Sequence, residues 1–179
     1  AIAPQAAGTV NPACNFPCRI KAADGLMVFN PDHLCLGVDL DPAHAVMDLY
    51  HSAGVDVVVM LVSDEEALEK TGRDLKALYA EHGLDVIYLP TPDFSVPSAD
   101  ALLPALRQAQ AEASAGRNLA VHCNAGIGRT GLFMACLARR VFGMNAAQAV
   151  AWVRQYIDGA VEEDVQYALV ESLAVEPTR

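Results

Sequence analysis

Short apolar runs and longer segments with helical spacing alternate along this chain. Residues 55–62 are almost continuously apolar, which is typical of a parallel strand buried on both faces of a sheet. Similar but shorter runs occupy residues 86–89 and 118–121. Between them lie segments of ten or more residues whose composition and spacing favour helices. This alternation predicts an α/β fold with a doubly wound, mostly parallel central sheet.

Several further elements complete the expected order. Residues 19–29 predict a short hairpin, and residues 33–40 predict a strand in which apolar and polar positions alternate. Ser63 is placed to cap a helix whose pattern is interrupted at Gly72. Helices are expected at residues 43–53, 64–81, 98–115, 132–141, 145–156 and 162–173.

The ten residues at positions 122–131 read His-Cys-Asn-Ala-Gly-Ile-Gly-Arg-Thr-Gly and separate a predicted strand from a predicted helix. In such an arrangement the backbone N–H groups of the loop converge, and the helix N-terminus adds about half a positive charge. A loop of this kind binds a tetrahedral oxyanion and stabilises a thiolate placed inside it. Gly126 and Gly128 let the backbone turn tightly and approach a ligand closely.

The other side chains of this loop fit covalent chemistry on a phosphate ester. Cys123 is expected to be a thiolate at neutral pH and therefore a nucleophile. Arg129 supplies a planar fork of donors that holds two phosphate oxygens at once, which a lysine cannot do. Thr130 offers a hydroxyl that stabilises the thiolate when it leaves. The alternative is a buried cysteine before an ordinary strand-to-helix turn.

The string from His122 through Cys123-x5-Arg129-Thr130 to Gly131 resembles the signature of the cysteine-dependent protein tyrosine and dual-specificity phosphatases. The resemblance implies a single domain in which helices flank both faces of a central, mostly parallel sheet. It also implies hydrolysis of phosphomonoesters through a cysteinyl-phosphate intermediate, with no metal and no cofactor.

The resemblance covers about residues 34–173. Gly159-Ala160-Val161 and the following Gln166 resemble the small kinase-associated-phosphatase branch of the dual-specificity phosphatases, in which a glutamine lies near the active site. We therefore expect an irregular N-terminal segment at residues 1–30 that packs on a phosphatase catalytic domain at residues 31–179.

The reaction also needs an acid, because an alkoxide or phenolate leaves poorly unless it is protonated. Asp93 lies in a proline-rich loop after the predicted strand at 86–89, 30 positions before Cys123, which matches the acid loop of the family. Asp85 precedes that strand and so belongs to the opposite edge of the sheet. Asp100 falls in a predicted first helical turn, where a carboxylate has a structural role.

The remaining site residues are assigned from the same motif. His122 is expected to order the loop by hydrogen bonds, and Gln166 is expected to help place the hydrolytic water. The predicted substrate-binding residues are Asn124, Ala125, Gly126, Ile127, Gly128, Arg129 and Gln166.

The expected substrates are phosphorylated proteins. A chain of 179 residues lacks the added loops of tyrosine-specific members, so we expect a shallow cleft that accepts phosphotyrosine and also phosphoserine and phosphothreonine. Asn124, Ala125 and Ile127 are uncharged, whereas phosphoinositide-directed members carry lysines in the loop. The alternatives are a phosphatase of phosphoinositides or other small phosphate esters, a phosphate-binding pseudophosphatase, or another thiol enzyme such as a sulfurtransferase or arsenate reductase. Phosphate, sulfate and vanadate are expected to bind in the loop.

Charge and cysteine content exclude other classes of partner. The net charge of −10 argues against nucleic acid and anionic membranes, and no apolar run reaches the ~18–20 residues of a membrane helix. The five cysteines have no disulfide framework spacing, and Cys14 and Cys18 have no second pair of metal ligands. We expect a cytoplasmic monomer. Residues 103–160 carry six arginines against two acidic residues. Either the helix surfaces there simply carry arginines, or the arginines attract a phosphorylated substrate to the loop.

Overall fold

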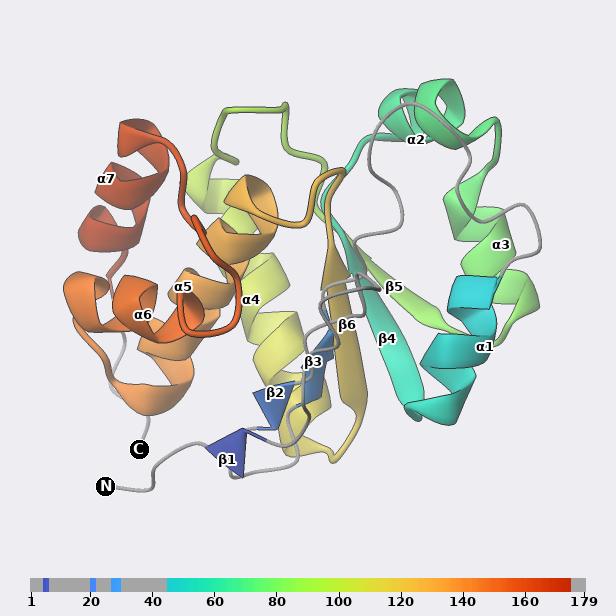
Figure 1. Cartoon of the computed structure of the whole chain (residues 1–179), viewed down its shortest axis with the longest axis horizontal. Helices are drawn as coiled ribbons and strands as arrows, with labels where there is room; N and C mark the ends of the chain where they lie inside the picture. Colours follow the sequence, from blue (N-terminus) through green and yellow to red (C-terminus); the bar gives the residue numbers. More distant parts are fainter. Residues whose placement is uncertain (1–4, 7–19, 22–26, 30–44, 175–179) are drawn as a thin grey trace.

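The computed structural model of the chain describes residues 5–6, 20–21, 27–29 and 45–174. The described strands form one sheet in the order β1-β2-β3-β6-β4-β5 (Figure 1). Their bounds are β1 Gln5–Ala6, β2 Ile20–Lys21, β3 Met27–Phe29, β4 Val55–Met60, β5 Asp85–Tyr88 and β6 Asn118–His122.

The centre of this sheet is parallel. Strand β6 pairs in parallel with β3 on one side and with β4 on the other, and β4 pairs in parallel with β5. The first two strands extend the sheet as antiparallel neighbours, with Ile20 opposite Val28. The predicted mostly parallel sheet is therefore confirmed.

The N-terminal segment differs from its expected irregular character. Gln5–Ala6 forms a strand within residues 1–30, because its backbone groups pair with the hairpin strand Ile20–Lys21. The hairpin predicted over residues 19–29 is confirmed by the pairing of β2 with β3. The strand predicted at 33–40 lies outside the described residues, and the division at residue 30 stays a prediction.

Helices cover both faces of the sheet (Figure 1). Helices α1, α2 and α3 lie on one side, and α4, α5, α6 and α7 lie on the other. The helices are α1 Ala45–Ser52, α2 Asp64–Thr71, α3 Leu75–Glu81, α4 Ala99–Ser114, α5 Gly128–Phe142, α6 Ala146–Val153 and α7 Asp164–Ser172.

The helix starts follow from capping side chains. The Ser63 hydroxyl accepts a hydrogen bond from the Glu66 N–H, and the Ser98 hydroxyl accepts one from the Ala101 N–H. The break predicted at Gly72 is confirmed, because this residue ends α2 in the left-handed region with φ of 70°.

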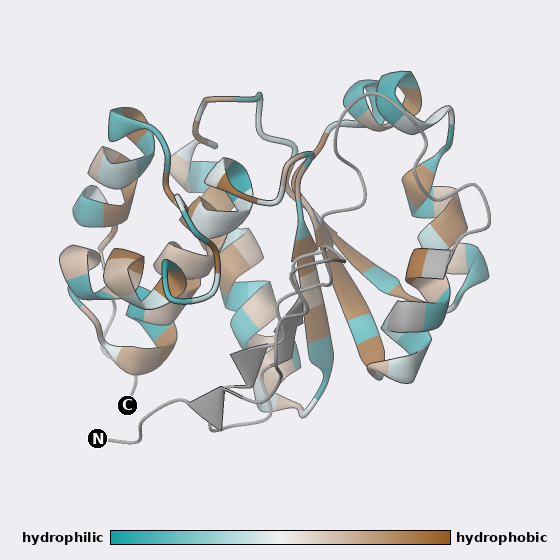
Figure 2. Cartoon of the chain, viewed as in Figure 1, coloured by the Kyte–Doolittle hydropathy of each residue, from teal (hydrophilic) through white to brown (hydrophobic). Residues whose placement is uncertain are grey.

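The core lies between the parallel strands and the helices on either side. Figure 2 shows the central strands as largely hydrophobic. Val58, Val59 and Met60 of β4 are fully buried, and so is most of α5. Helix α5 begins at Gly128, four residues earlier than predicted, because the last glycines of the loop already belong to its first turn.

This architecture brings three chain segments to one edge of the sheet. The segments that follow β4, β5 and β6 all leave from the carboxyl ends of neighbouring parallel strands. They lead to α2, to the proline-rich loop and to the loop that begins at Cys123 (Figure 1). None of the described helices is both long enough and apolar enough to cross a membrane.

Candidate active site

The loop between β6 and α5, which we call the cysteine loop (residues 123–127), forms the centre of the site. It begins at Cys123, directly after the last residue of β6, and leads into Gly128, the first residue of α5. Ile127 occupies the N-cap position and makes no side-chain capping hydrogen bond. The backbone N–H groups in the first turn of α5 can thus donate hydrogen bonds to an anion.

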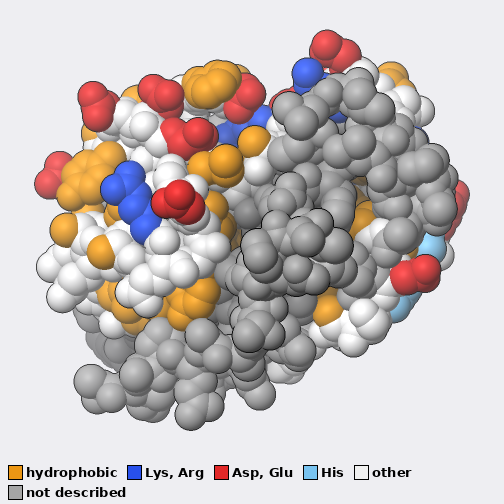
Figure 3. All heavy atoms as spheres, viewed as in Figure 1, with side chains coloured by type: hydrophobic (Ala, Val, Ile, Leu, Met, Phe, Trp, Pro, Cys, Tyr) orange, Lys and Arg blue, Asp and Glu red, His pale blue; other side chains and the backbone are white. Residues whose placement is uncertain are grey.

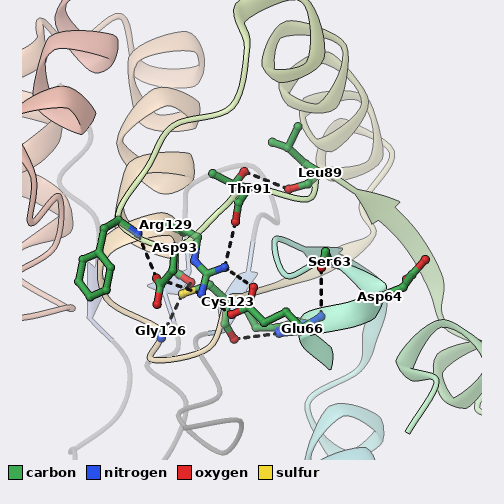
Figure 4. Close-up of polar contacts among 12 residues, drawn as sticks. Ser63, Asp64, Glu66, Leu89, Thr91, Asp93, Cys123, Gly126 and Arg129 are labelled. Carbon is green, nitrogen blue, oxygen red and sulfur yellow. Dashed lines mark hydrogen bonds and ion pairs between the residues drawn. The ribbon is translucent and has the colours of Figure 1, made fainter. Parts of the chain in front are cut away.

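The Cys123 sulfur lies inside this loop and is almost fully buried (Figure 4). It accepts hydrogen bonds from the Gly126 N–H and from the Thr130 hydroxyl, both at 3.2 Å. Gly126 adopts a positive φ of 74°, which turns its N–H back toward the sulfur. Both donors are placed where they would stabilise negative charge on the sulfur.

The Arg129 side chain is buried next to the loop and is held from outside it. Its two terminal nitrogens donate to the two carboxylate oxygens of Glu66, at 2.7 and 2.8 Å. One of them also donates to the Thr91 carbonyl oxygen at 3.0 Å. The Nε–H of Arg129 is buried and has no acceptor among the described residues. The guanidinium is therefore fixed in place while one donor stays available to an oxyanion.

Glu66 was missed by sequence reasoning. It lies in the first turn of α2, and its backbone N–H completes the Ser63 cap. A carboxylate in a first helical turn has an ordinary explanation in the helix dipole, so its type and position carried no catalytic signal. Its distance of 63 positions from Arg129 also gave no hint of the pairing.

Asp93 lies at the same edge, in the loop after β5. One of its carboxylate oxygens is 3.2 Å from Arg129 Nη2 and also accepts from the Phe94 N–H (Figure 4). Its side chain is 53% exposed, so it borders both the loop and solvent. Phe94 has a positive φ of 54°, which is uncommon for an aromatic residue.

The two rival carboxylates lie elsewhere, as predicted. Asp85 begins β5 at the other edge of the sheet and forms an ion pair with Arg117 at 2.5 Å. Asp100 lies in the first turn of α4. Asp93 is therefore the one of the three that reaches the cysteine loop.

His122 is fully buried beneath the loop and connects two elements. Its Nδ1 is 3.2 Å from the Cys123 carbonyl oxygen, and its Nε2 is 2.9 Å from the Tyr79 hydroxyl. A carbonyl only accepts, so Nδ1 carries the proton and the Tyr79 hydroxyl donates to Nε2. Burial lowers the pKa of His122 to about 4, and burial raises the pKa of Tyr79. At neutral pH the side chains of His122 and Tyr79 are thus both uncharged.

The depressed pKa of His122 predicts an acid-sensitive fold. The unfolded chain binds a proton on this residue near pH 6.5, whereas the folded chain binds it only near pH 4, so stability falls as the pH drops through this window. Between about pH 7.5 and about pH 5 we expect His122 to lower the free energy of unfolding by about 2 kcal/mol. Urea unfolding of His122→Gln should show lower stability at pH 7.5 but a smaller loss on acidification. Equal losses of stability on acidification in wild type and His122→Gln would show that His122 is not the cause.

Gln166 is buried against the start of α5, rather than on a helix surface. Its Oε1 accepts from the Glu162 N–H at 3.0 Å, and its Nε2 donates to the Ser95 carbonyl oxygen at 3.4 Å. A Cβ added to Gly128 would lie 3.2 Å from Gln166 Nε2. The structure thus brings Gln166 to the cysteine loop and connects it to the loop that carries Asp93.

The remaining predicted loop residues differ in exposure. Ala125 is exposed, Asn124 and Ile127 are half-buried, and Gly126 and Gly128 are buried. All five lie in the turn between Cys123 and Arg129, so the structure keeps the predicted substrate-binding set together except for Gln166, which joins it from α7.

Four of the six arginines in residues 103–160 bind other groups of the protein. Of the six arginines, Arg117 lies at the far edge with Asp85 and Glu112. Arg139 donates to the carbonyl oxygens of Val170 and Leu173 at the end of α7.

Two further arginines also serve the fold. Arg140 is buried and donates to Gln110, and Arg154 donates to the Ala160 and Val161 carbonyl oxygens. Helix arginines are well suited to satisfying carbonyl groups at helix ends and loops, so their number near a motif does not measure the charge around it.

No group of three or more potential metal ligands occurs among the described residues. Cys14 and Cys18 lie outside them. Cys136 is fully buried in α5, where burial raises the pKa of its thiol to about 12, so it belongs to the core as expected.

Comparisons with known proteins agree with this geometry. The family model described as "Tc-R-P: Polymorphic toxin system, DSP-PTPase phosphatase" matches residues 40–141. The chain is 31% identical over 93 residues to the tyrosine-protein phosphatase cdc-14 of Caenorhabditis elegans, covering 52% of this chain and 13% of that protein. It is 30% identical over 114 residues to laforin of Mus musculus, covering 57% and 34%. The chain therefore spans only a minor part of these relatives.

Solved structures show the same fold. Tk-PTP in its active form superposes with a TM-score of 0.66 at 26% identity, over 81% of this chain and 88% of that one. Kinase associated phosphatase reaches 0.71 at 19% identity, over 81% and 83%, and PTPMT1 in complex with PI(5)P reaches 0.64 at 17%, over 80% and 87%. These last two likenesses concern the fold alone, so the branch within the superfamily stays a prediction. The chain belongs to the DSP-PTPase phosphatase family of polymorphic toxin systems, and thus to the dual-specificity and protein tyrosine phosphatase superfamily.

Proposed function

We propose that this chain removes phosphate from phosphotyrosine, phosphoserine and phosphothreonine of proteins through a cysteinyl-phosphate at Cys123. The observation that carries the proposal is the geometry of the loop. A buried sulfur accepts two hydrogen bonds, and a buried arginine beside it has an unpartnered Nε–H. A nucleophile and an oxyanion donor thus meet at the N-terminus of α5.

In the first step the Cys123 sulfur attacks phosphorus. The S–P bond forms while the bond from phosphorus to the leaving oxygen breaks, and Asp93 in its protonated form gives its proton to that oxygen. The backbone N–H groups of the loop and Arg129 hold the three non-bridging oxygens. Asp93 is exposed and adjacent to Arg129, which suits a group that must reach the leaving oxygen.

In the second step water attacks phosphorus. Asp93, now a carboxylate, takes a proton from this water as the S–P bond breaks and inorganic phosphate forms. The Thr130 hydroxyl donates to the sulfur as the thiolate returns. Gln166 is a candidate to position the water, because its side chain lies between Gly128 and the loop that carries Asp93.

The protein substrate is favoured over a phosphoinositide by the character of the loop. Asn124, Ala125 and Ile127 carry no charge, and Arg129 is the basic side chain that the described part of the chain brings to the loop. An inositol ring with several phosphates needs further cations, which the described residues around the loop do not supply.

A substrate panel tests the proposal directly. We expect wild-type protein to hydrolyse a chromogenic aryl phosphate and phosphopeptides carrying each of the three phosphorylated residues, at fixed salt. If inositol phosphates were hydrolysed faster than the peptides, the proposed protein substrate would be wrong, but the proposed phosphatase activity would stand. Binding of phosphate or vanadate without turnover of any ester would indicate a pseudophosphatase.

Glu66 is expected to act as a positioning residue for Arg129. Glu66→Gln keeps the size of the side chain but removes the charge that pairs with the guanidinium, so Arg129 should lose its fixed orientation. We expect kcat/KM for an aryl phosphate to fall by up to about 10²-fold, with a weaker inhibition constant for vanadate. The readout is steady-state kinetics at constant pH.

Glu65→Gln is the matched control, because Glu65 is an exposed carboxylate in the same helical turn. It should behave as wild type. A Glu66→Gln protein with lower thermal stability but unchanged kcat/KM and vanadate inhibition would show that Glu66 serves only the fold.

A further inference from the structure

The segment before α7 has a strained backbone next to the cysteine loop. Val161 has a φ of 60°, in the left-handed region that a β-branched residue rarely adopts, and it is buried. Gly159, two positions earlier, has a φ of 71°. Strain of this kind costs free energy and persists only where the surroundings enforce it, often beside functional sites.

Two contacts enforce it here. Arg154 donates from Nε to the Ala160 carbonyl oxygen at 2.9 Å and from Nη2 to the Val161 carbonyl oxygen at 3.1 Å. On the other side, the segment packs on Gly131 of α5. A Cβ at Gly131 would come within 2.7 Å of the Ala160 Cβ and 2.9 Å of the Val161 nitrogen. The absence of a side chain at Gly131 thus lets the segment approach the first turn of α5.

The result is that the Glu162 carboxylate lies on the cysteine loop. Its Oε2 is the atom that a Cβ at Gly128 would meet first, ahead of the Gln166 amide. Glu162 is an exposed residue, and its side chain forms no ion pair with any described lysine or arginine. Among the described residues, this negative charge therefore has no cationic partner, and it lies beside a loop that can hold a dianion.

This charge has neighbours of the same sign. Asp93 is exposed on the facing loop, and Asp164 is exposed at the start of α7. Figure 3 shows Asp and Glu side chains along the upper edge of this face, above α7. Arg129 and Arg154 are already engaged, since Arg129 is paired with Glu66 and Arg154 donates to backbone carbonyl oxygens.

We propose that Glu162 is a specificity-determining residue that selects phosphopeptides with a lysine or arginine close to the phosphorylated residue and rejects substrates with a second anionic group there. This inference rests on the proposed function. A cation beside the phosphate gains an interaction with Glu162, whereas a neighbouring carboxylate or second phosphate is repelled, whether it belongs to a peptide or to an inositol ring. The strained segment keeps the carboxylate in that position.

The test compares two phosphopeptides that differ only in the residues flanking the phosphate, lysine in one and glutamate in the other. Wild-type protein should prefer the lysine peptide in kcat/KM. In Glu162→Gln the ratio of the two kcat/KM values should fall by roughly tenfold at low salt, and in Glu162→Lys the preference should reverse. Glu171→Gln makes the same charge change on the exposed far part of α7 and should keep the wild-type ratio.

Each outcome addresses one of the two proposals. If the ratio of the two kcat/KM values stays unchanged in the Glu162 variants, while all proteins turn over an aryl phosphate with no charge on its aryl group, Glu162 has no role in specificity and the phosphatase proposal stands. Absence of aryl phosphate turnover in wild type would instead overturn the proposed function. Wild-type preference for the glutamate peptide or for an inositol bisphosphate would also contradict the inference.

Discussion

Cys123→Ser should abolish turnover of an aryl phosphate while leaving the oxyanion site intact. A serine hydroxyl at this position is not ionised at neutral pH and is a poor nucleophile. The neutral His122 cannot activate it, because its two ring nitrogens are bound to Tyr79 and to a carbonyl oxygen. We expect kcat to fall on the order of 10⁴-fold or more.

Binding separates loss of the nucleophile from loss of the site. The oxygen of the serine is smaller than sulfur and keeps the donors of Gly126 and Thr130, so titration calorimetry should still show binding of phosphate or vanadate. Cys136→Ser is a poor control, because Cys136 is buried in the core. The control is instead wild-type protein in which the Cys123 thiol is reversibly blocked. Substantial turnover by Cys123→Ser would rule out the sulfur as nucleophile.

Asp93→Asn should lower kcat by about 10²–10⁴-fold, the usual contribution of a general acid. The asparagine preserves size and the contact with the Phe94 N–H but has no proton to give. The loss should therefore grow with the basicity of the leaving group. A nitrophenolate leaves without much help, whereas an alkyl oxygen such as that of serine needs the proton.

The measurement is kcat for a series of aryl phosphates and one phosphoserine peptide, in wild type and variant. Asp100→Asn is the control, because Asp100 lies in the first turn of α4 and should leave the series unchanged. A uniform loss of kcat across all leaving groups would show that Asp93 orients Arg129 rather than supplying a proton. The general acid would then be unassigned.

The sequence predicted the elements of the site that are local in the chain. Cys123, Arg129 and Thr130 lie within eight residues, so spacing alone placed them on one loop. Asp93 was found because it follows a strand, and parallel neighbouring strands deliver their carboxyl ends to the same edge. The parallel sheet and most helices followed from apolar spacing for the same reason, namely that the signal lies within one segment.

Features that depend on side-chain direction were not predictable from the pattern. Glu66 and Arg129 are 63 positions apart, and nothing in the first turn of α2 distinguishes Glu66 from Glu65. The arginine count near the motif left the charge around the loop open, because it does not show that Arg139 and Arg154 bind carbonyl oxygens. The position of Glu162 depends on a left-handed valine, which sequence gives no means to expect.

The most direct test of the account is to trap the phosphoryl group on the protein. The protein is mixed with an excess of aryl phosphate that carries a labelled phosphate group, and is quenched in acid during turnover. The label should then lie on the peptide that contains Cys123, and it should be absent from Cys123→Ser. Turnover at full rate without any protein-bound label at the shortest times, or label mapped to a different residue, would contradict the account.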